Sequence, residues 1–218
     1  MEVVERLLGI DVSALSDADK TLPIVDPAVR AMIPGVRMAG PAFTVRADDD
    51  HLPVMTALAE AAPGDVLVVA AGGGGPALVG ELFATEARRR RLAGIVVDGF
   101  CRDLRGLREI GLPVFARGTT PRSGTTVSRA AAGATVAFGG VEVAPGDLVV
   151  GDDDGLLVAP PGRIAAALDA AEGIARAERA ILAAQAGGEA LHDLTNHAEH
   201  VAALDRGEPS ALAFRVDA

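Results

Sequence analysis

The feature that most constrains the fold is an alternation of short apolar runs and helical segments between residues 65 and 117. The apolar runs "DVLVVAA" (65–71), "GIVVD" (94–98) and "PVFAR" (113–117) have the length and composition of buried strands. Helices are predicted between them, over residues 78–91 and 103–110. This order of strands and helices predicts a parallel sheet that is covered on both faces.

The segments on either side show other patterns. Before the alternation, the sequence predicts a helix over residues 1–20 with a turn at "SDAD", a loop at "DPAVRAMIPG" and a strand around 42–45. An amphipathic helix then starts at His51 and is closed by Pro63 and Gly64. After the alternation, "TVAFGGVEVAPGDLVVGDDDGLLVAP" has short strands separated by Gly, Pro and Asp, which is typical of β-hairpins.

The C-terminal part begins with an Ala-rich segment, residues 162–186, that has a helical spacing of Ile and Leu. The residues after it are weakly patterned, and either pack on a neighbouring subunit or are partly disordered. A chain of 218 residues has room for one sizeable core. We therefore expect one α/β domain over residues 1–186 and a C-terminal extension over residues 187–218.

The charge and cysteine content exclude several classes of protein. Thirty acidic and twenty basic residues give a net charge of -10, which repels nucleic-acid backbones and anionic membranes. The basic run Arg88 to Arg91 lacks interleaved aromatic residues and is interpreted as an exposed helix C-terminus. No signal-peptide core or long apolar run is present, and the single Cys101 fits a structural thiol in a reducing compartment. We expect a soluble cytoplasmic protein with no nucleic-acid or membrane partner.

A run of glycines at residues 72–75 leaves two alternatives. Gly72, Gly74 and Ala77 match the pattern G-x-G-x-x-A, and Asp98 follows about 21 residues later, as in a dinucleotide-binding turn. Pro76 removes an amide from that turn, and the later hairpins do not repeat strand-helix-strand units, so this interpretation is disfavoured. The other alternative is a plain turn from a strand into a helix.

The helix after the glycines offers a site for an anion in either case. Its first turn has free amides at Leu82 and Phe83 that can hold a carboxylate, and Glu81 lies at the same end. Two further charged residues, Arg102 and Asp103, follow the strand "GIVVD", at the edge where parallel α/β units bind ligands. Arg102 can bind a substrate carboxylate while Asp103 holds a divalent cation. The alternative is that Asp103 only caps the next helix.

Two other clusters are interpreted as structural. Asp152, Asp153 and Asp154 lack the spacing of a calcium-binding loop and predict a turn between hairpin strands. The histidines of "HDLTNHAEH" lack the motif of a zinc protease and have no supporting cysteines, so they are assigned to the extension.

With these residues in view, the chain resembles the RraA-like family, which includes the class II 4-hydroxy-4-methyl-2-oxoglutarate aldolases and the regulators of ribonuclease E activity. The resemblance covers most of residues 10–185 and follows the family order through "GPAFTV", "PGDVLVV", "GELFATEARRRRLAGIVVDGFCRD", "IGLPVFARG" and "GDLVVGDDDGLLVAPP". It implies an αββ sandwich resembling the swivelling phosphohistidine domain, with a C-terminal helix and extension. It also implies a homotrimer or hexamer with sites at subunit interfaces.

The aldolases of this family carry an acidic residue, twenty intervening residues and then Arg-Asp. Glu81, residues 82–101 and Arg102-Asp103 match this spacing, with Glu where the family usually has Asp. The resemblance implies that Asp103 binds Mg2+, or Mn2+ or Co2+, and that Arg102 contacts the carboxylate and keto end of the substrate. It further implies substrate binding at Gly80, Leu82 and Phe83, and an acidic residue from a neighbour's C-terminal helix, for which we select Glu178.

The resemblance therefore implies a divalent-metal lyase that releases pyruvate from a small 2-oxo acid with a carboxylate on C4. Retro-aldol cleavage of 4-hydroxy-4-methyl-2-oxoglutarate and decarboxylation of oxaloacetate pass through the same pyruvate enolate, so one site can catalyse both. A Lewis-acidic metal would stabilise that enolate, and a water ordered by Glu81 would act as the base. The alternative is a non-enzymatic regulator that binds a ribonuclease E-type enzyme.

Overall fold

The computed structural model describes residues 2–72, 74–129 and 131–215. Its helices are α1 (Glu2–Leu7), α2 (Val12–Ala18), α3 (His51–Glu60), α4 (Glu81–Arg89), α5 (Leu104–Ile110), α6 (Pro161–Ala186) and α7 (His197–Asp205). Its strands are β1 (Arg30–Ala31), β2 (Met38–Arg46), β3 (Val66–Ala70), β4 (Ala77–Val79), β5 (Gly94–Cys101), β6 (Val114–Thr119), β7 (Val136–Phe138), β8 (Val141–Val143), β9 (Leu148–Asp152) and β10 (Gly155–Ala159).

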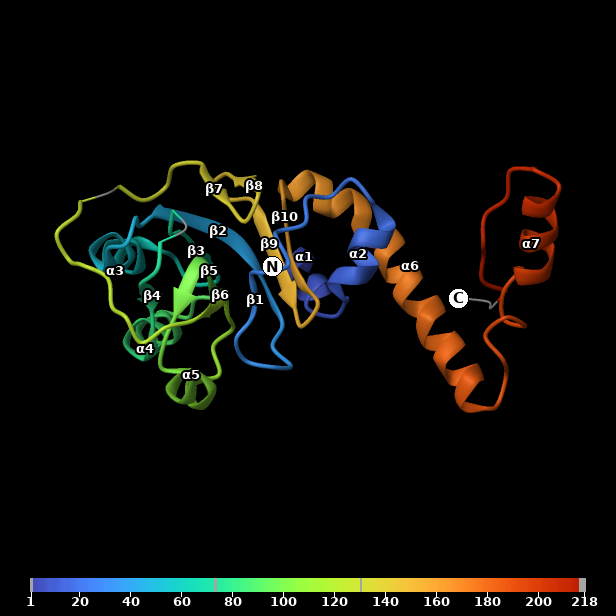
Figure 1. The fold of residues 1–218 in the computed structure, drawn as a ribbon, viewed down its shortest axis with the longest axis horizontal. Coiled ribbons are helices and arrows are strands. Elements are labelled where there is room, and N and C mark those ends of the chain that lie inside the picture. The colour runs from blue at the N-terminus through green and yellow to red at the C-terminus, as the bar shows by residue number, and fades with distance from the viewer. Residues whose placement is uncertain (1, 73, 130, 216–218) are drawn as a thin grey trace.

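The central sheet has the strand order β1-β6-β5-β3-β2-β9-β10, and β4 pairs with the end of β5. Strands β2, β3, β5 and β6 run parallel to one another, whereas β9 and β10 form an antiparallel hairpin. The pair β7 and β8 forms a second hairpin. The predicted change from parallel strands to hairpins is therefore confirmed, and the fold is an α/β sandwich with a C-terminal helix (Figure 1).

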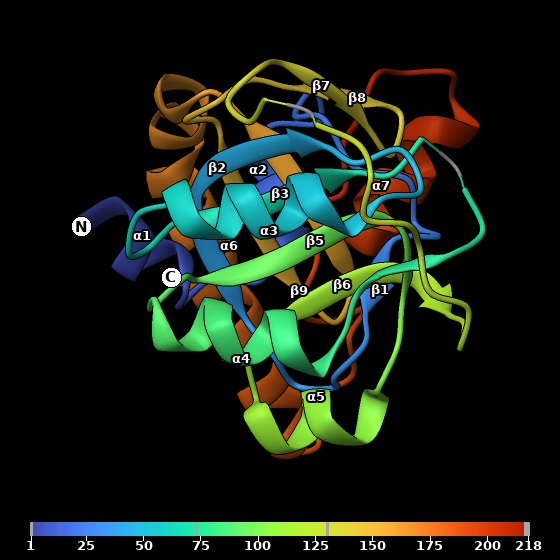
Figure 2. The ribbon, with the colours of Figure 1, turned by 90° about the vertical axis from the view of Figure 1, so that its left-hand side faces the viewer.

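The alternation of side chains along β3 shows how the sheet separates two cores. Leu67 and Val69 belong to the cluster beneath α3 and α4, and Val66 and Val68 belong to the cluster that contains Phe115 and the β7-β8 hairpin. Figure 2 shows α3 and α4 lying across one face of the sheet. Because successive residues of a strand point to opposite faces, a continuous apolar run is required where both faces are covered.

The N-terminal helices and α6 form a third layer against the β9-β10 hairpin. Leu15, Leu157 and Leu168 lie in the apolar cluster that joins them, which extends along α6 as far as Ala175. Beyond that residue α6 projects from the body of the molecule and leads to α7, which lies at the far end (Figure 1). Among the described residues, no helix combines the length and apolar composition needed to cross a membrane.

Three predicted elements need correction. The single helix over residues 1–20 is two helices, and "SDAD" falls mostly inside α2, where it was predicted to be a turn. The loop "DPAVRAMIPG" contains the short strand β1, which pairs with β6. The helix predicted from residue 78 begins only at Glu81, because residues 77–79 are buried as β4 and pair with β5. Pairing within the sheet outweighs the local helical pattern there.

The glycine run therefore leads into a strand, and neither alternative for it is correct. Gly72 adopts a left-handed conformation with φ 66°, and the chain then enters β4. A dinucleotide-binding turn requires a helix N-terminus directly after the glycines. Since α4 starts at Glu81, after the intervening strand, that interpretation is wrong.

Candidate functional site

Two helix N-termini meet at the carboxyl edge of the parallel sheet. Helix α4 begins at Glu81, directly after β4, and α5 begins at Leu104, directly after β5. The amide of Arg102 donates a hydrogen bond to the Val79 carbonyl at 3.0 Å, which joins the two connections. The sheet thus brings together the acidic residue and the Arg-Asp pair that the sequence spacing singled out.

Asp103 is at the centre of this arrangement. Its Oδ2 lies 3.3 Å from the amide nitrogen of Glu81 and 3.3 Å from Nε of Arg102. Its backbone is left-handed, with φ 62°, and its side chain makes no capping hydrogen bond to α5. Asp103 therefore occupies the N-cap position of α5, but its side chain does not cap the helix. A non-glycine residue in this conformation costs about 1–3 kcal/mol, and such residues cluster at functional sites.

Two glycines allow the charged side chains to approach the helix ends. A Cβ added to Gly80 would lie 2.6 Å from Oδ2 of Asp103 and 3.0 Å from Cγ of Arg102. A Cβ added to Gly106 would lie 2.5 Å from both Cδ and Oε2 of Glu81. Side chains at either position would overlap with these groups. The carboxylate of Glu81 therefore packs against α5, and that of Asp103 packs against the start of α4.

A cavity of about 280 Å3 opens beside the Arg-Asp pair. It is lined by Arg102 and Asp103 from the end of β5, and by Thr119, Thr120 and Pro121 from the end of β6. The side chains of Arg102 and Asp103 are 38% and 41% exposed, so both are accessible to a ligand. The lining does not include Gly80, Glu81, Leu82 or Phe83, although the Glu81 amide contacts Asp103. Residues 119–121 were not among the predicted site residues, although they too lie at the end of a parallel strand.

The first turn of α4 retains its capacity to bind an anion. The amide of Glu81 faces Asp103, and that of Ala84 is bonded to the Gly80 carbonyl. Within the described part of the chain, the amides of Leu82 and Phe83 have no hydrogen-bond acceptor. The side chain of Leu82 is 79% exposed. Free amides at a helix N-terminus attract carboxylates, and substrate binding by this turn stays a prediction.

A strap formed by residues 119–128 connects the cavity to the start of α3. His51 accepts a hydrogen bond at Nε2 from the Gly124 amide at 3.0 Å and lies 2.9 Å from Oγ of Ser123. Its Nδ1 lies 3.3 Å from the Leu78 carbonyl, and its ring contacts that of Phe83. The histidine therefore links the strap to both β4 and α4.

Asp50 fixes the far end of the strap. Its carboxylate accepts hydrogen bonds from Oγ1 of Thr125 and from the amides of Val127, Ser128 and Leu52, at 2.6–3.0 Å. Burial alone would raise the pKa of Asp50, but these hydrogen bonds outweigh it and hold the pKa far below its ordinary value. The side chain is a permanent anion at neutral pH, and its role is structural.

The remaining candidates do not contribute to the lining of this cavity. Cys101 is buried, and desolvation raises the pKa of its thiol to about 11, which agrees with a structural thiol. The acidic run at 152–154 forms the predicted turn between β9 and β10. The arginines of the basic run lie at the end of α4, where Arg89 pairs with Glu86 and Arg90 donates to the Ala61 carbonyl. None of these residues lines the cavity beside Arg102.

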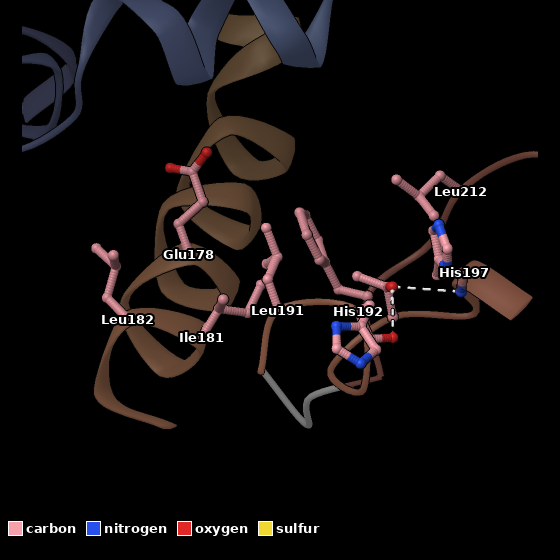
Figure 3. Close-up of a pocket in the computed structure, with 9 residues that line it drawn as sticks. Glu178, Ile181, Leu182, Leu191, His192, His197 and Leu212 are labelled. Atoms are coloured by element: carbon pink, nitrogen blue, oxygen red, sulfur yellow. Dashed lines mark hydrogen bonds between the residues drawn. The ribbon is translucent and has the colours of Figure 1, made fainter. Parts of the chain in front are cut away.

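A larger cavity, of about 740 Å3, lies between the second half of α6 and residues 191–214 (Figure 3). Its lining is mainly aliphatic, with His192 and His197 on one side, and the carboxylate of Glu178 points away from these histidines (Figure 3). The described residues that line it include no arginine or lysine. An apolar cavity without a cation is unsuited to a small dianion, so we place the candidate site at the smaller cavity beside Arg102.

Known proteins show the same fold and sequence pattern. The RraA-like family (Aldolase/RraA) matches residues 12–158. A protein of Halalkalibacterium halodurans, provisionally named a 4-hydroxy-4-methyl-2-oxoglutarate aldolase, is 34% identical over 165 residues, which are 75% of this chain and 79% of that protein.

Two solved structures extend the comparison. An uncharacterized protein from Pseudomonas syringae pv. tomato superposes with a TM-score of 0.79 at 26% identity, over 88% of this chain and 92% of that one. The RNA-processing inhibitor RraA from Thermus thermophilis superposes with a TM-score of 0.64 at 32% identity, over 69% of this chain and 92% of that one. The family pattern covers more than half of the sequence, and the fold agrees. The chain therefore belongs to the RraA-like family.

Proposed function

We propose that this protein is a divalent-metal-dependent lyase that releases pyruvate from 2-oxo acids with a carboxylate on C4. The observation that carries the proposal is the contact of Asp103 with both Arg102 and the first turn of α4, at the edge of one cavity. The arrangement combines an anionic metal ligand, a guanidinium and free helix amides within one site. The aldolase name of the Halalkalibacterium halodurans relative supports the same chemistry.

The side chains at the site are compatible with Mg2+. Magnesium is held in proteins by one or two carboxylates and keeps several waters or substrate oxygens as further ligands. The side chain of Asp103 is 41% exposed, and within the described part of the chain its Oδ2 makes two polar contacts, both at 3.3 Å. Within the described residues, no three His, Cys, Asp or Glu side chains form a metal cluster. One chain therefore offers Asp103 as a ligand, and waters, the substrate and a neighbouring subunit would supply the others.

The protein groups have separate roles in the proposed reaction. When bound, the cation supplies Lewis-acid polarisation of the 2-keto oxygen. The planar guanidinium of Arg102 binds the adjacent carboxylate and balances the charge that develops as the C3–C4 bond breaks. The amides of Leu82 and Phe83 hold a carboxylate oxygen. Glu81 orders a water that takes the proton from the C4 hydroxyl, and the electron pair of the broken bond passes to C3.

Protonation at C3 completes the formation of pyruvate. With oxaloacetate, the same bond breaks and carbon dioxide leaves, so no hydroxyl proton has to be removed. This difference predicts that Glu81→Gln reduces retro-aldol cleavage more than it reduces decarboxylation. The two reactions together therefore separate the role of Glu81 from that of Arg102 and Asp103.

The assay measures pyruvate released from oxaloacetate and from 4-hydroxy-4-methyl-2-oxoglutarate with Mg2+, Mn2+ or Co2+. We expect activity that chelation removes, and that Asp103→Asn reduces by at least 100-fold with the melting temperature unchanged. Glu109→Gln, an acid removed from the exposed face of α5, is the matched control and should keep full activity. Absence of pyruvate with all three metals would rule out the proposal.

We also propose a homotrimer or hexamer with its sites at subunit interfaces. Among the described residues, Asp103 belongs to no group of three His, Cys, Asp or Glu side chains, and Leu82 on α4 and Val127 on the strap are 79% and 83% exposed. A neighbouring subunit would cover these side chains and bring an acid such as Glu178 to the metal. Light scattering gives the mass of the assembly, and Glu178→Gln should lower metal affinity if that residue completes the site.

A second candidate function is inhibition of a ribonuclease E-type enzyme. It is favoured by the similarity to the RNA-processing inhibitor RraA from Thermus thermophilis. Regulation by binding does not require a metal ligand beside a guanidinium. A stoichiometric complex with the ribonuclease, in a preparation without lyase activity, would establish this function instead.

A further inference from the structure

A second cavity lies at the opposite edge of the sheet from Arg102 and Asp103. It has a volume of about 410 Å3 and is formed where β2, β5 and β6 begin, with Met38, Ala93 and Pro113 in its lining. Its floor is apolar, because Met38, Leu92 and Leu112 are nearly fully buried there. The volume falls within the range of small-molecule sites.

Three arginines line this apolar floor: Arg37, Arg88 and Arg91. Two of them are held in place by backbone carbonyls. Nη1 of Arg37 donates to the Ile10 carbonyl at 3.0 Å, and Nη1 of Arg88 donates to the Ile110 carbonyl. Arg37 also forms an ion pair with Asp11. On a chain with a net charge of -10, three arginines around one cavity form a local positive site.

Arg91 is the least expected of the three. It follows the end of α4 in a left-handed conformation, with φ 62°, which is a position that glycine usually occupies. Its side chain makes no hydrogen bond or ion pair with the residues that the structure describes. The Arg91 backbone is hydrogen-bonded to Gly64 and Arg88, but within the described part of the chain no contact of the guanidinium offsets the strain of an L-residue here. A ligand that binds the guanidinium would account for an arginine at this position.

We propose that this cavity binds an amphiphilic carboxylate, with its apolar chain on the floor of Met38 and Leu92 and its anionic head at Arg88 and Arg91. Guanidinium groups bind carboxylates with paired hydrogen bonds, and the buried floor favours a chain of methylene groups over a small polar acid. This inference does not depend on the proposed lyase activity, because the two cavities share no residue.

The test is a calorimetric titration of the full-length protein with sodium decanoate below its critical micelle concentration. We expect saturable binding with one site per chain, at least tenfold weaker binding of decanol, and no binding of acetate. Arg91→Gly should weaken decanoate binding at least tenfold. Its melting temperature should stay the same or rise, because glycine adopts the left-handed conformation without strain. Arg105→Ala, which removes an exposed arginine of α5 outside the cavity, should bind decanoate as the wild type does.

Arg88→Gln is the second variant, and it should give the same loss of affinity if Arg91→Gly does not fold. Equal affinity for decanoate in the wild type and in folded Arg91→Gly would overturn the proposal. So would a wild type that shows no saturable binding. The alternative is that a second copy of the chain covers the cavity. In that case Arg91→Gly would change the mass of the assembly in light scattering, and decanoate would not bind to either protein. This outcome also contradicts the proposal.

Discussion

Replacing Gly106 with alanine should displace the carboxylate of Glu81 without unfolding the protein. The added Cβ would lie 2.5 Å from Cδ and Oε2 of Glu81, whereas unstrained contacts are about 3.5 Å or longer. The end of the glutamate must therefore move by roughly 1 Å. Since that end is flexible, the movement costs little stability. Alanine in the interior of α5 is worth up to about 1 kcal/mol over glycine, so the net change in unfolding free energy should be within about 1 kcal/mol.

The effect on catalysis should be much larger. A misplacement of about 1 Å in a catalytic group can lower the rate by about 100-fold. We therefore expect the retro-aldol kcat of Gly106→Ala to fall by one to two orders of magnitude, with a smaller fall for oxaloacetate decarboxylation. Glu81→Asp shortens the side chain by one methylene and removes the overlap. The double variant should then regain activity relative to Gly106→Ala alone.

The assay is a double-mutant cycle on the retro-aldol kcat, with thermal unfolding measured for each variant. The reasoning requires a coupling between the two substitutions, because the residues are in contact. If Gly106→Ala keeps the wild-type kcat, or if the effects of the two substitutions simply add, the carboxylate of Glu81 does not act from its position against α5.

The remaining predictions concern the strap and the buried thiol. Asp50→Asn should lower the melting temperature by several degrees and speed amide exchange at Val127 and Ser128. Folding lowers the pKa of Asp50 from an ordinary 3.8. The stabilising effect of its carboxylate is therefore present above about pH 4 and declines as the pH falls below that value. His51→Ala should raise the KM for substrate several-fold and speed amide exchange at Gly124, and His51→Gln should restore part of this loss. An unchanged KM in His51→Ala would show that the strap does not affect substrate binding. Cys101 should react with a thiol reagent at pH 8 at least 100-fold more slowly in the native protein than in urea, since burial raises its pKa to about 11; rapid native labelling would contradict its burial.

The parallel strands were predictable because the pattern that indicates them lies within each strand's own sequence. The run of β3 is apolar over its whole length, and β6 begins with three buried apolar residues; only a strand covered on both faces requires such a run. The start of α4 was not predictable in the same way. Ala77 and Leu78 of β4 have good helical propensity, and they belong to a strand because β5 offers them an edge. This pairing depends on residues about twenty positions away, which a local pattern does not include.

The candidate site was likewise predictable only where its residues belong to one sequence motif. The spacing from Glu81 to Arg102 and Asp103 identified side chains that the fold brings together. The cavity also needs residues 119–121, and its strap depends on His51. These residues come from separate strands and loops, and no motif in the sequence connects them. The rule that ligands bind at the carboxyl ends of parallel strands would have found residues 119–121, but not His51.

At the start of α4 and of α5, an acidic side chain from each helix packs against a glycine at the start of the other. Gly80, before α4, leaves space for the carboxylate of Asp103, which comes from the start of α5. Gly106, inside α5, leaves space for the carboxylate of Glu81, which comes from the start of α4. Each glycine is needed because the acid of the other helix lies against it. A longer acid at position 81 is therefore accommodated by the absence of a side chain on α5, and the geometry of the site depends on these four residues together.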